Sequence, residues 1–506
     1  MAIQTLLKHA FRESGLNSVY ITGLDAWLII LNRSCRMFAY GAISLILALF
    51  FAELKISDSR IGLFMSLTLL GDVILSLLLT LIADRVGRRR TLFAGSLLMI
   101  MSGVIFALCE NFWALLFAAV VGVISATGGD FGPFRVIEES TVSELTNPET
   151  RNDVLVWYVT LASIGSSIGT EMAGRIIEWL QVKNGWTLLD AYHACFWLYV
   201  VMGSVNMVSI AFMSEKCELK GRSAASSTVS SASSTHSPED SGTTETAPLL
   251  TNNPEDDDPK QPSTPTKQPP KPTWSWTSAT QISRETFSIM LLLWVLLMID
   301  SLADGMVYMS LTTYFISIKF PSLPKSTLGD MLSTAYLLSS LSSPFAGPLA
   351  RHIGLINTMV FTHIPSSAAV LFFPLPKSVG WTFGLLLLRT GLNNMDQAPR
   401  AALIAAVVRP EERTAVMGIT GMLRTLAGSV GPSVTGFLAG GGRFWVAFVV
   451  AGALRLAYDV GLWAIFVNVR LHRHELPEVG AVEEGEGGDE GGEGQVVGEG
   501  GRGQVV

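Results

Sequence analysis

The chain has 506 residues, a mean hydropathy of +0.42 and only 15% charged residues, compared with roughly 25% in a soluble protein. This composition excludes a set of soluble domains, and the scattered Cys and His residues predict neither a metal site nor a cofactor. The net charge of −7 arises in two polar segments, since residues 475–506 carry nine acids and one Arg, and residues 215–283 carry nine acids and six bases.

Twelve apolar runs are each long enough to cross about 30 Å of hydrocarbon. Residues 1–25 precede them and show no signal-peptide pattern, because Lys8, Arg12 and Glu13 interrupt any apolar stretch. The runs lie near residues 26–53, 60–83, 91–109, 112–138, 152–178, 192–213, 286–316, 327–350, 355–374, 380–408, 413–438 and 444–468. We therefore expect an all-α membrane protein with twelve transmembrane helices in two pseudo-symmetric six-helix bundles, residues 26–214 and 285–468.

Two segments are too polar to bury a core. Residues 215–284 are rich in Ser, Thr and Pro, and residues 469–506 in Gly and Glu, so we expect a disordered linker and a disordered tail. Arg and Lys gather in the even-numbered loops, such as the four arginines of residues 85–90. The positive-inside rule then places the linker and both termini in the cytosol.

Four short patterns occur once in each group of spans, in the same order and about 265 residues apart. Two homologous membrane halves around a shared site are the layout of a secondary transporter. The matched segments are residues 36–41 with 300–305, 83–90 with 347–355, 128–133 with 393–399, and 147–151 with 409–413.

The loop after the second span, ADRVGRRR, resembles the signature loop of the major facilitator superfamily. The resemblance implies a gate at the cytosolic mouth, in which arginines pair with acids at the ends of neighbouring helices. Residues 133–151 resemble the end of the fourth helix and the next loop of this superfamily, and residues 428–436 resemble its exporters' glycine-proline motif. The implied gate residues are Asp84, Arg85, Gly87, Arg88, Arg89, Glu138, Glu139, Glu144 and Arg151, with Arg351, Gly354 and Arg413 in the second half.

Charged side chains inside the spans are candidates for the solute and proton site, because each costs roughly 2.5–3.5 kcal/mol to bury in lipid. In the resembled fold, helices 1, 4, 7 and 10 line the central cavity. The candidates are Arg36, Tyr40, Asp130, Asp300, Asp304, Arg389, Asp396 and Arg400, together with Asp72 on helix 2 as a packing group or a proton site.

The repeat aligns Arg36 with Asp300, which predicts an ion pair or a substrate clamp across the cavity. Arg36 could instead reach lipid phosphates. Arg424 and the Arg455/Asp459 pair are assigned a structural role.

These observations predict a secondary active transporter of a small organic solute, not an enzyme, that works by rocking of the two bundles. We expect coupling to protons carried by Asp300, Asp304 and Asp130, because an acid in a dry cavity can bind and release protons as access alternates. Export of a metabolite or drug is the first choice. Sugar-like uptake and a transport-inactive sensor are the alternatives, and the chain has no P-loop for ATP.

The linker carries one candidate sorting signal. Glu245, Leu249 and Leu250 fit the acidic dileucine pattern, which predicts a sorting adaptor as partner and a vacuolar or lysosomal membrane, with the plasma membrane as the alternative. The other expected partners are the bilayer, the solute and protons. We expect a monomer that binds no nucleic acid.

Overall fold

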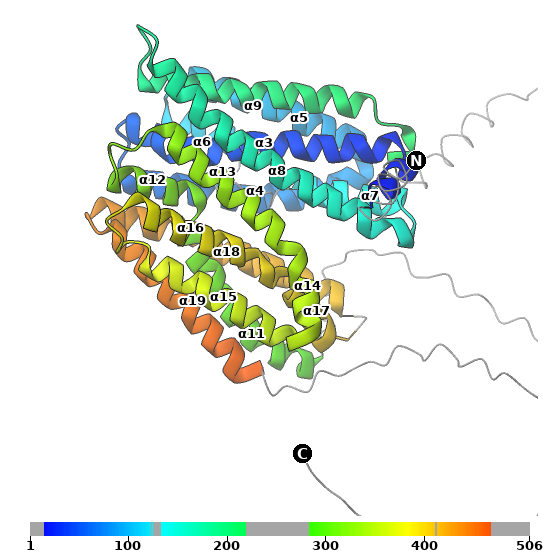
Figure 1. Ribbon diagram of the computed structural model, residues 1–506. Coiled ribbons are helices and arrows are strands. Elements are labelled where there is room, and N and C mark those ends of the chain that lie inside the picture. The colour runs from blue at the N-terminus through cyan, green and yellow to red at the C-terminus, as the bar shows by residue number, and fades with distance from the viewer. Residues whose placement is uncertain (1–14, 123, 125–132, 219–282, 410–411, 467–506) are drawn as a thin grey trace, which may run out of the picture.

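The computed structural model describes residues 15–122, 124, 133–218, 283–409 and 412–466, and every element in this part of the chain is helical (Figure 1). The linker, the tail, Asp130 and the dileucine motif lie outside the described residues. The N-half comprises α2 (Leu16–Thr22), α3 (Leu24–Glu53), α4 (Asp58–Val86), α5 (Arg88–Leu108), α6 (Phe112–Val121), α7 (Pro133–Leu145), α8 (Pro148–Gln181), α9 (Leu188–Ala211) and the short η1 (Glu215–Cys217).

The C-half contains the second set of spans. It comprises α11 (Arg284–Met306), α12 (Met309–Lys319), α13 (Lys325–Ser342), η3 (Ser343–Phe345), α14 (Ala346–Ile353), α15 (Leu355–Phe372), α16 (Val379–Asn393), η4 (Asn394–Asp396), α17 (Gln397–Val407), α18 (Arg413–Gly440) and α19 (Phe444–Phe466). Among the described residues, seven helices are long and apolar enough to cross a membrane on their own. Two of the other five expected spans are the more polar α8 and α18. The last three are each made of more than one helix: α6 with α7, α13 with α14, and α16 with α17.

Several spans that we expected to be continuous are broken. The seventh span bends between α11 and α12, where Tyr308 has an extended backbone (φ −51°, ψ 155°). The eighth passes through η3, which contains Pro344, and the tenth passes through η4. In the fourth span, α6 ends at Val121 and α7 begins at Pro133. A hydropathy pattern misses these breaks because it averages over a whole span, and the helices on either side of each break are mostly apolar.

The internal repeat is visible in the backbone. Gly87 and Gly354 begin the third and ninth spans with φ of +109° and +88°, a conformation that favours glycine. Gly41 on α3 and Gly305 on α11 occupy matching close contacts: an added Cβ would lie 2.2 Å from the Ser166 carbonyl oxygen and 2.1 Å from that of Gly428, respectively. The two halves are therefore built on the same plan.

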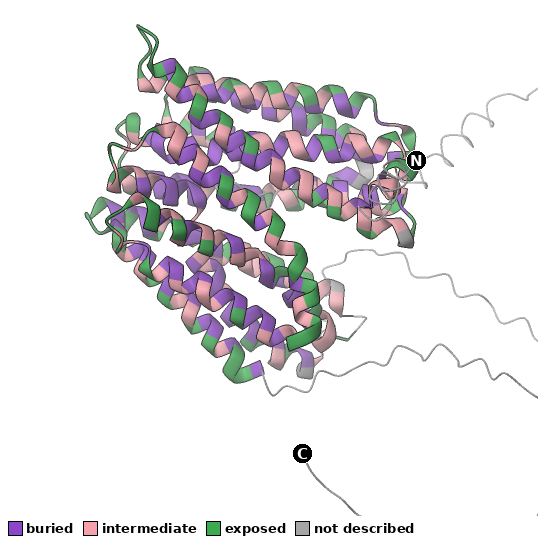
Figure 2. Cartoon of the chain, viewed as in Figure 1, coloured by how far each residue is buried: buried purple, intermediate pink, exposed green. Residues whose placement is uncertain are grey.

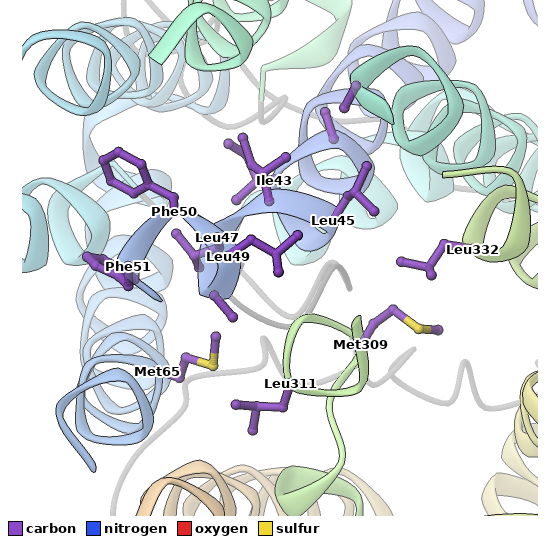
Figure 3. Packing of buried hydrophobic residues seen from close by; sticks show 14 of the residues in the cluster. Ile43, Leu45, Leu47, Leu49, Phe50, Phe51, Met65, Met309, Leu311 and Leu332 are labelled. Atoms are coloured by element: carbon purple, nitrogen blue, oxygen red, sulfur yellow. The ribbon is translucent and has the colours of Figure 1, made fainter. Parts of the chain in front are cut away.

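The hydrophobic cores show how the halves meet. One cluster contains buried residues of both halves, whereas a second lies wholly in the N-half and a third wholly in the C-half. The shared cluster joins the last turns of α3 to α4, α12 and α13 (Figure 3). We call this the closed end, and the opposite end, where residues 218 and 283 lie, the linker end.

Direct bonds between the halves gather at the closed end. Ser66 accepts from the Ser433 hydroxyl at 2.8 Å, Ser167 bonds to Ser333 at 2.8 Å, and the Tyr314 hydroxyl donates to Asp58 at 2.7 Å. The halves diverge toward the linker end (Figure 1). Exposed positions recur along the helices (Figure 2), and many of them carry large apolar side chains, for example Trp381 and Phe437, each 75% exposed, as contact with lipid requires.

Candidate functional site

The N-half contains a buried ion pair between its first and fourth spans. The Arg36 guanidinium on α3 donates two bonds to the Glu138 carboxylate on α7, at 2.8 and 2.7 Å. The Tyr158 hydroxyl on α8 donates to the same carboxylate at 2.8 Å. Arg36 and Glu138 are only 5% and 1% exposed, and both line a narrow cavity together with Tyr40. A bidentate, hydrogen-bonded pair of this kind can remain ionised in a dry interior.

This pair overturns the predicted coupling of Arg36 with Asp300. Arg36 is bound to Glu138 within its own half, and Asp300 lies beside His363 and Arg400 in the other half. The repeat places Arg36 and Asp300 on equivalent helices, but each is bonded inside its own bundle. The two halves remain related in another way. In each half a charged residue of the first span faces a residue of opposite charge on the fourth span: Arg36 faces Glu138, and Asp300 faces Arg400.

The predicted cytosolic gate is only partly assembled at the linker end. Arg88 binds Glu144 at 2.8 Å and Ser140 at 2.7 Å, whereas Glu139 pairs with Arg135 at 2.7 Å and Glu138 is the partner of Arg36. We therefore correct the expectation that Glu138 and Glu139 bind the arginines after the second span. The side chains of Asp84 and Arg85 lie outside the described residues.

The remaining gate residues also bond within their own halves. The backbone N–H groups of Arg88 and Arg89 donate to the Glu218 carboxylate, which caps α5. Arg151 donates to the Ser143 carbonyl oxygen, and Arg413 to that of Val408. Arg351 is exposed at the end of α14. Since the halves diverge here, these contacts describe the open arrangement of the linker end.

A larger network of buried charges fills the interior of the C-half. At its centre is Asp300 on α11, which is fully buried. Neither of its carboxylate oxygens has a hydrogen-bond partner in the described part of the chain. The closest cationic or titratable groups are His363 Nε2, at 3.6 Å from Oδ1, and Arg400 Nη1, at 4.0 Å from Oδ2. A buried carboxylate without hydrogen bonds depends on nearby positive groups to remain ionised, and here these groups lie at the edge of ion-pair distance.

His363 on α15 connects Asp300 to the twelfth span. Its Nδ1 lies 2.7 Å from Asp459 Oδ1, and Ser367 donates to the other oxygen of that carboxylate at 2.8 Å. Its Nε2 lies 2.7 Å from Arg455 Nη2. The imidazole therefore contacts a carboxylate on one side and a guanidinium on the other, while 2% exposed.

Two arginines connect the network to the broken spans. Arg455 binds Asp304 on α11 at 2.9 Å and also donates to Asn393, the last residue of α16. Arg389 donates to Thr312 at 2.8 Å and to the Val307 carbonyl oxygen, which lies in the bend between α11 and α12. Arg389 thus satisfies backbone that the bend leaves without an intrahelical partner.

The structure brings several predicted residues together. Asp300, Asp304, Arg389, Asp396 and Arg400 all lie in the C-half interior, where Arg400 also binds Asp396. Asp72 and Tyr40 are buried in the N-half.

Sequence reasoning missed His363, and it did not show that Arg455 and Asp459, which it assigned a structural role, contact the same ring. The available signal was the cost of any ionisable group in an apolar span, which applies to these residues as it does to Asp300.

Known proteins resemble this chain in sequence and in fold. The family model described as Major Facilitator Superfamily matches residues 29–321 and 293–490. An uncharacterized membrane protein of Saccharomyces cerevisiae, YJR124C, is 31% identical over 437 residues, which cover 86% of this chain and 92% of that protein.

Solved structures share the fold at low sequence identity. The nucleoside transporter NupG has a TM-score of 0.61 at 12% identity, covering 87% of this chain and 98% of its own. The inward open xylose transporter XylE from E. coli has a TM-score of 0.59 at 12% identity, with coverages of 88% and 95%. A bacterial homolog of the human lysosomal transporter Spinster, inward-facing and unoccupied, has a TM-score of 0.58 at 14% identity, with coverages of 87% and 94%.

Proposed function

The chain belongs to the major facilitator superfamily, a family of membrane transporters, and from this premise we propose that it moves a small organic solute in exchange for, or together with, protons. The two halves rock about the closed end, and the linker end faces the cytosol. The proton is carried in the C-half network, with Asp300 as its principal acceptor.

The observation that carries this proposal is the environment of Asp300. It is 0% exposed, both of its oxygens lack hydrogen bonds among the described residues, and its nearest counter-charges lie at 3.6 and 4.0 Å. A carboxylate held only loosely by cations can be neutralised by a proton without breaking a close salt bridge. Such a group suits a transporter that must take up and release a proton in each cycle.

Export is the direction that we place first, with a metabolite or drug of mixed polarity as the solute. Partly exposed charges of both signs occur in the N-half, where the side chains of Arg135 and Glu139 are 41% and 37% exposed, and the C-half adds the acid Asp304 at 26%. Sugar-like uptake is the alternative, because Glu144 and Arg151 are seven residues apart, a spacing that resembles that of sugar porters in this superfamily. These two side chains do not pair, because Glu144 binds Arg88 and Arg151 donates to a carbonyl oxygen.

Proton coupling is tested in liposomes that contain the purified protein and a trapped pH-sensitive dye. Nucleosides, hexoses, dipeptides and organic anions are added in turn, and both solute flux and internal pH are recorded. We expect one of these classes to cross together with a pH change, and we expect Asp300→Asn to abolish the pH change while solute exchange continues. Glu110→Gln, which alters a 59% exposed carboxylate, should behave as the wild type.

Two results would contradict the proposal. Solute flux without any proton movement in the wild type would show an uncoupled carrier. A solute that raises the melting temperature of the protein but never crosses the membrane would favour the sensor.

A further inference from the structure

We propose that His363 is a second proton-binding group of the C-half, and that it changes its hydrogen-bond partner from Arg455 to Asp300 when it is protonated. This site lies between the ninth and twelfth spans, outside the four helices on which we expected the proton carriers. Its link to transport rests on the proposed function, but proton binding itself does not.

The contacts of the ring define its state in this structure. Arg455 can only donate, so Nε2 of His363, at 2.7 Å from Arg455 Nη2, must be the acceptor. The proton is then on Nδ1, which lies 2.7 Å from Asp459 Oδ1. Asp459 is fixed in turn by the Ser367 hydroxyl at 2.8 Å. The imidazole is therefore neutral and held in one tautomer by a carboxylate.

A proton added at Nε2 cannot coexist with the bond from Arg455, because two donors would then face each other. The nearest acceptor is Asp300 Oδ1, which is 3.6 Å from Nε2 and has no hydrogen bond in the described part of the chain. Protonation should therefore release Arg455 and draw Asp300 to the ring. The imidazolium would then lie between two carboxylates, Asp459 and Asp300.

The charged groups around the ring belong to one network. In this structure the network contains four carboxylates and four guanidiniums, and the neutral imidazole lies among them. From α11 the network contains Asp300 and Asp304, from α16 and η4 Arg389 and Asp396, from α17 Arg400, from α18 Arg424, and from α19 Arg455, Asp459 and the Tyr458 hydroxyl.

The partner that His363 releases is the one connected to the helix breaks. Arg455 also holds Asp304, two residues before the end of α11, and Asn393, at the end of α16. Loss of its bond to the ring changes how firmly these two ends are held. A proton on His363 in the ninth span would therefore change the contacts that Arg455 makes beside the breaks of the seventh and tenth spans.

The proton is observed directly by ¹⁵N nuclear magnetic resonance of histidine-labelled protein. The sample retains His363 alone, with His9, His193, His236, His352, His472 and His474 each replaced by Gln. We expect the two ring nitrogens to report the gain of a single proton as the pH is lowered. Asp459→Asn and Asp300→Asn should each move the midpoint to lower pH by about 1–3 units, because each removes a carboxylate that stabilises the imidazolium.

The matched control is Asp330→Asn, which removes a carboxylate of the same half at the closed end and should leave the midpoint unchanged. A ring that stays neutral from pH 4.5 to 9, or whose titration ignores Asp300→Asn, would overturn the site. The proposed function fails separately: His363 could titrate as described while liposome flux carries no proton. Conversely, proton-coupled flux that persists unchanged in His363→Gln would remove His363 from the coupling and leave Asp300 in place.

Discussion

Arg36 and Glu138 form a buried, bidentate ion pair, and this predicts an asymmetric response to mutation. Arg36→Met leaves Glu138 buried without its counter-charge, so we expect a loss of about 3–5 kcal/mol of stability. The double variant Arg36→Met, Glu138→Leu removes both charges and should recover most of that loss. Thermal unfolding in detergent measures both effects.

The control for this pair is Arg175→Met. The Arg175 side chain is 63% exposed, and its ion pairs with Glu171 and Asp330 lie at the surface. Exposed ion pairs contribute about 0–1 kcal/mol, so its melting temperature should change little. If Arg36→Met were as stable as Arg175→Met, the buried ion pair would not contribute measurably to the stability of the protein.

At this scale the sequence identified charged residues but not their partners. The cost of charge in lipid pointed correctly to Arg36, Asp300 and Arg400 as interior groups. The repeat gave equivalent positions along the two halves, but it carries no information on distance across the molecule. Glu138 was expected at the gate because the sequence places it near the end of the fourth span. A shift of one α-helical turn along the span is enough to separate a gate position from a buried one.

The packing of α18 against its neighbours predicts how the closed end opens. A Cβ on Gly62 of α4 would lie 2.2 Å from the Pro432 carbonyl oxygen, so even Gly62→Ala forces α4 and α18 apart. We expect this variant to favour the state in which the closed end is open. The readout is maleimide labelling of Ser44→Cys, which should rise several-fold because Ser44 lies between the halves beside Tyr336.

Gly421→Ala is the matched control on α18, the helix that Gly62 contacts, since an added Cβ there meets nothing within 4 Å. Cys35, Cys109 and Cys195 are replaced by Ser in both backgrounds. Burial raises the pKa of the Cys217 thiol to about 12, so Cys217 should stay unlabelled at neutral pH. Equal labelling of the two glycine variants would show that this contact does not set the balance between states.

Helix existence could be predicted from the sequence, whereas helix continuity could not. Long apolar runs located the spans because lipid demands them. The bend at Tyr308 depends on Arg389, which lies about 80 residues away in the chain and bonds to the backbone at Val307. No local pattern around residues 307–308 contains that information.

For the molecule as a whole, the linker predicts a destination. If Glu245, Leu249 and Leu250 form a sorting signal, the tagged wild type should reside in an internal acidic compartment. The double variant Leu249→Ala, Leu250→Ala should move to the cell surface, because an adaptor would no longer bind the peptide. Microscopy of both proteins in the same cells decides between these outcomes.

A change at nearby residues that are not part of the motif, such as Asn252→Ala, Asn253→Ala, controls for disturbance of the linker. Identical distributions of all three proteins would mean that the dileucine has no sorting role.

The two-half architecture was predictable because both halves carry the same four patterns. The sequence could not predict which end of the molecule is open, because the same sequence must adopt both the state that is open at the linker end and the state that is open at the closed end. The difference lies in which contacts are made, such as the shared core at the closed end, rather than in which residues are present.

The hydroxyl contacts between the halves have a consequence for the energetics of the transport cycle. Bonds such as Ser66–Ser433 and Ser167–Ser333 each contribute only about 0.5–1.5 kcal/mol, and water can replace them when the halves separate. The two end states are therefore expected to differ little in free energy. A solute or proton that favours one state by about 1.4 kcal/mol changes the ratio of the two populations tenfold, so weak binding suffices to direct the cycle.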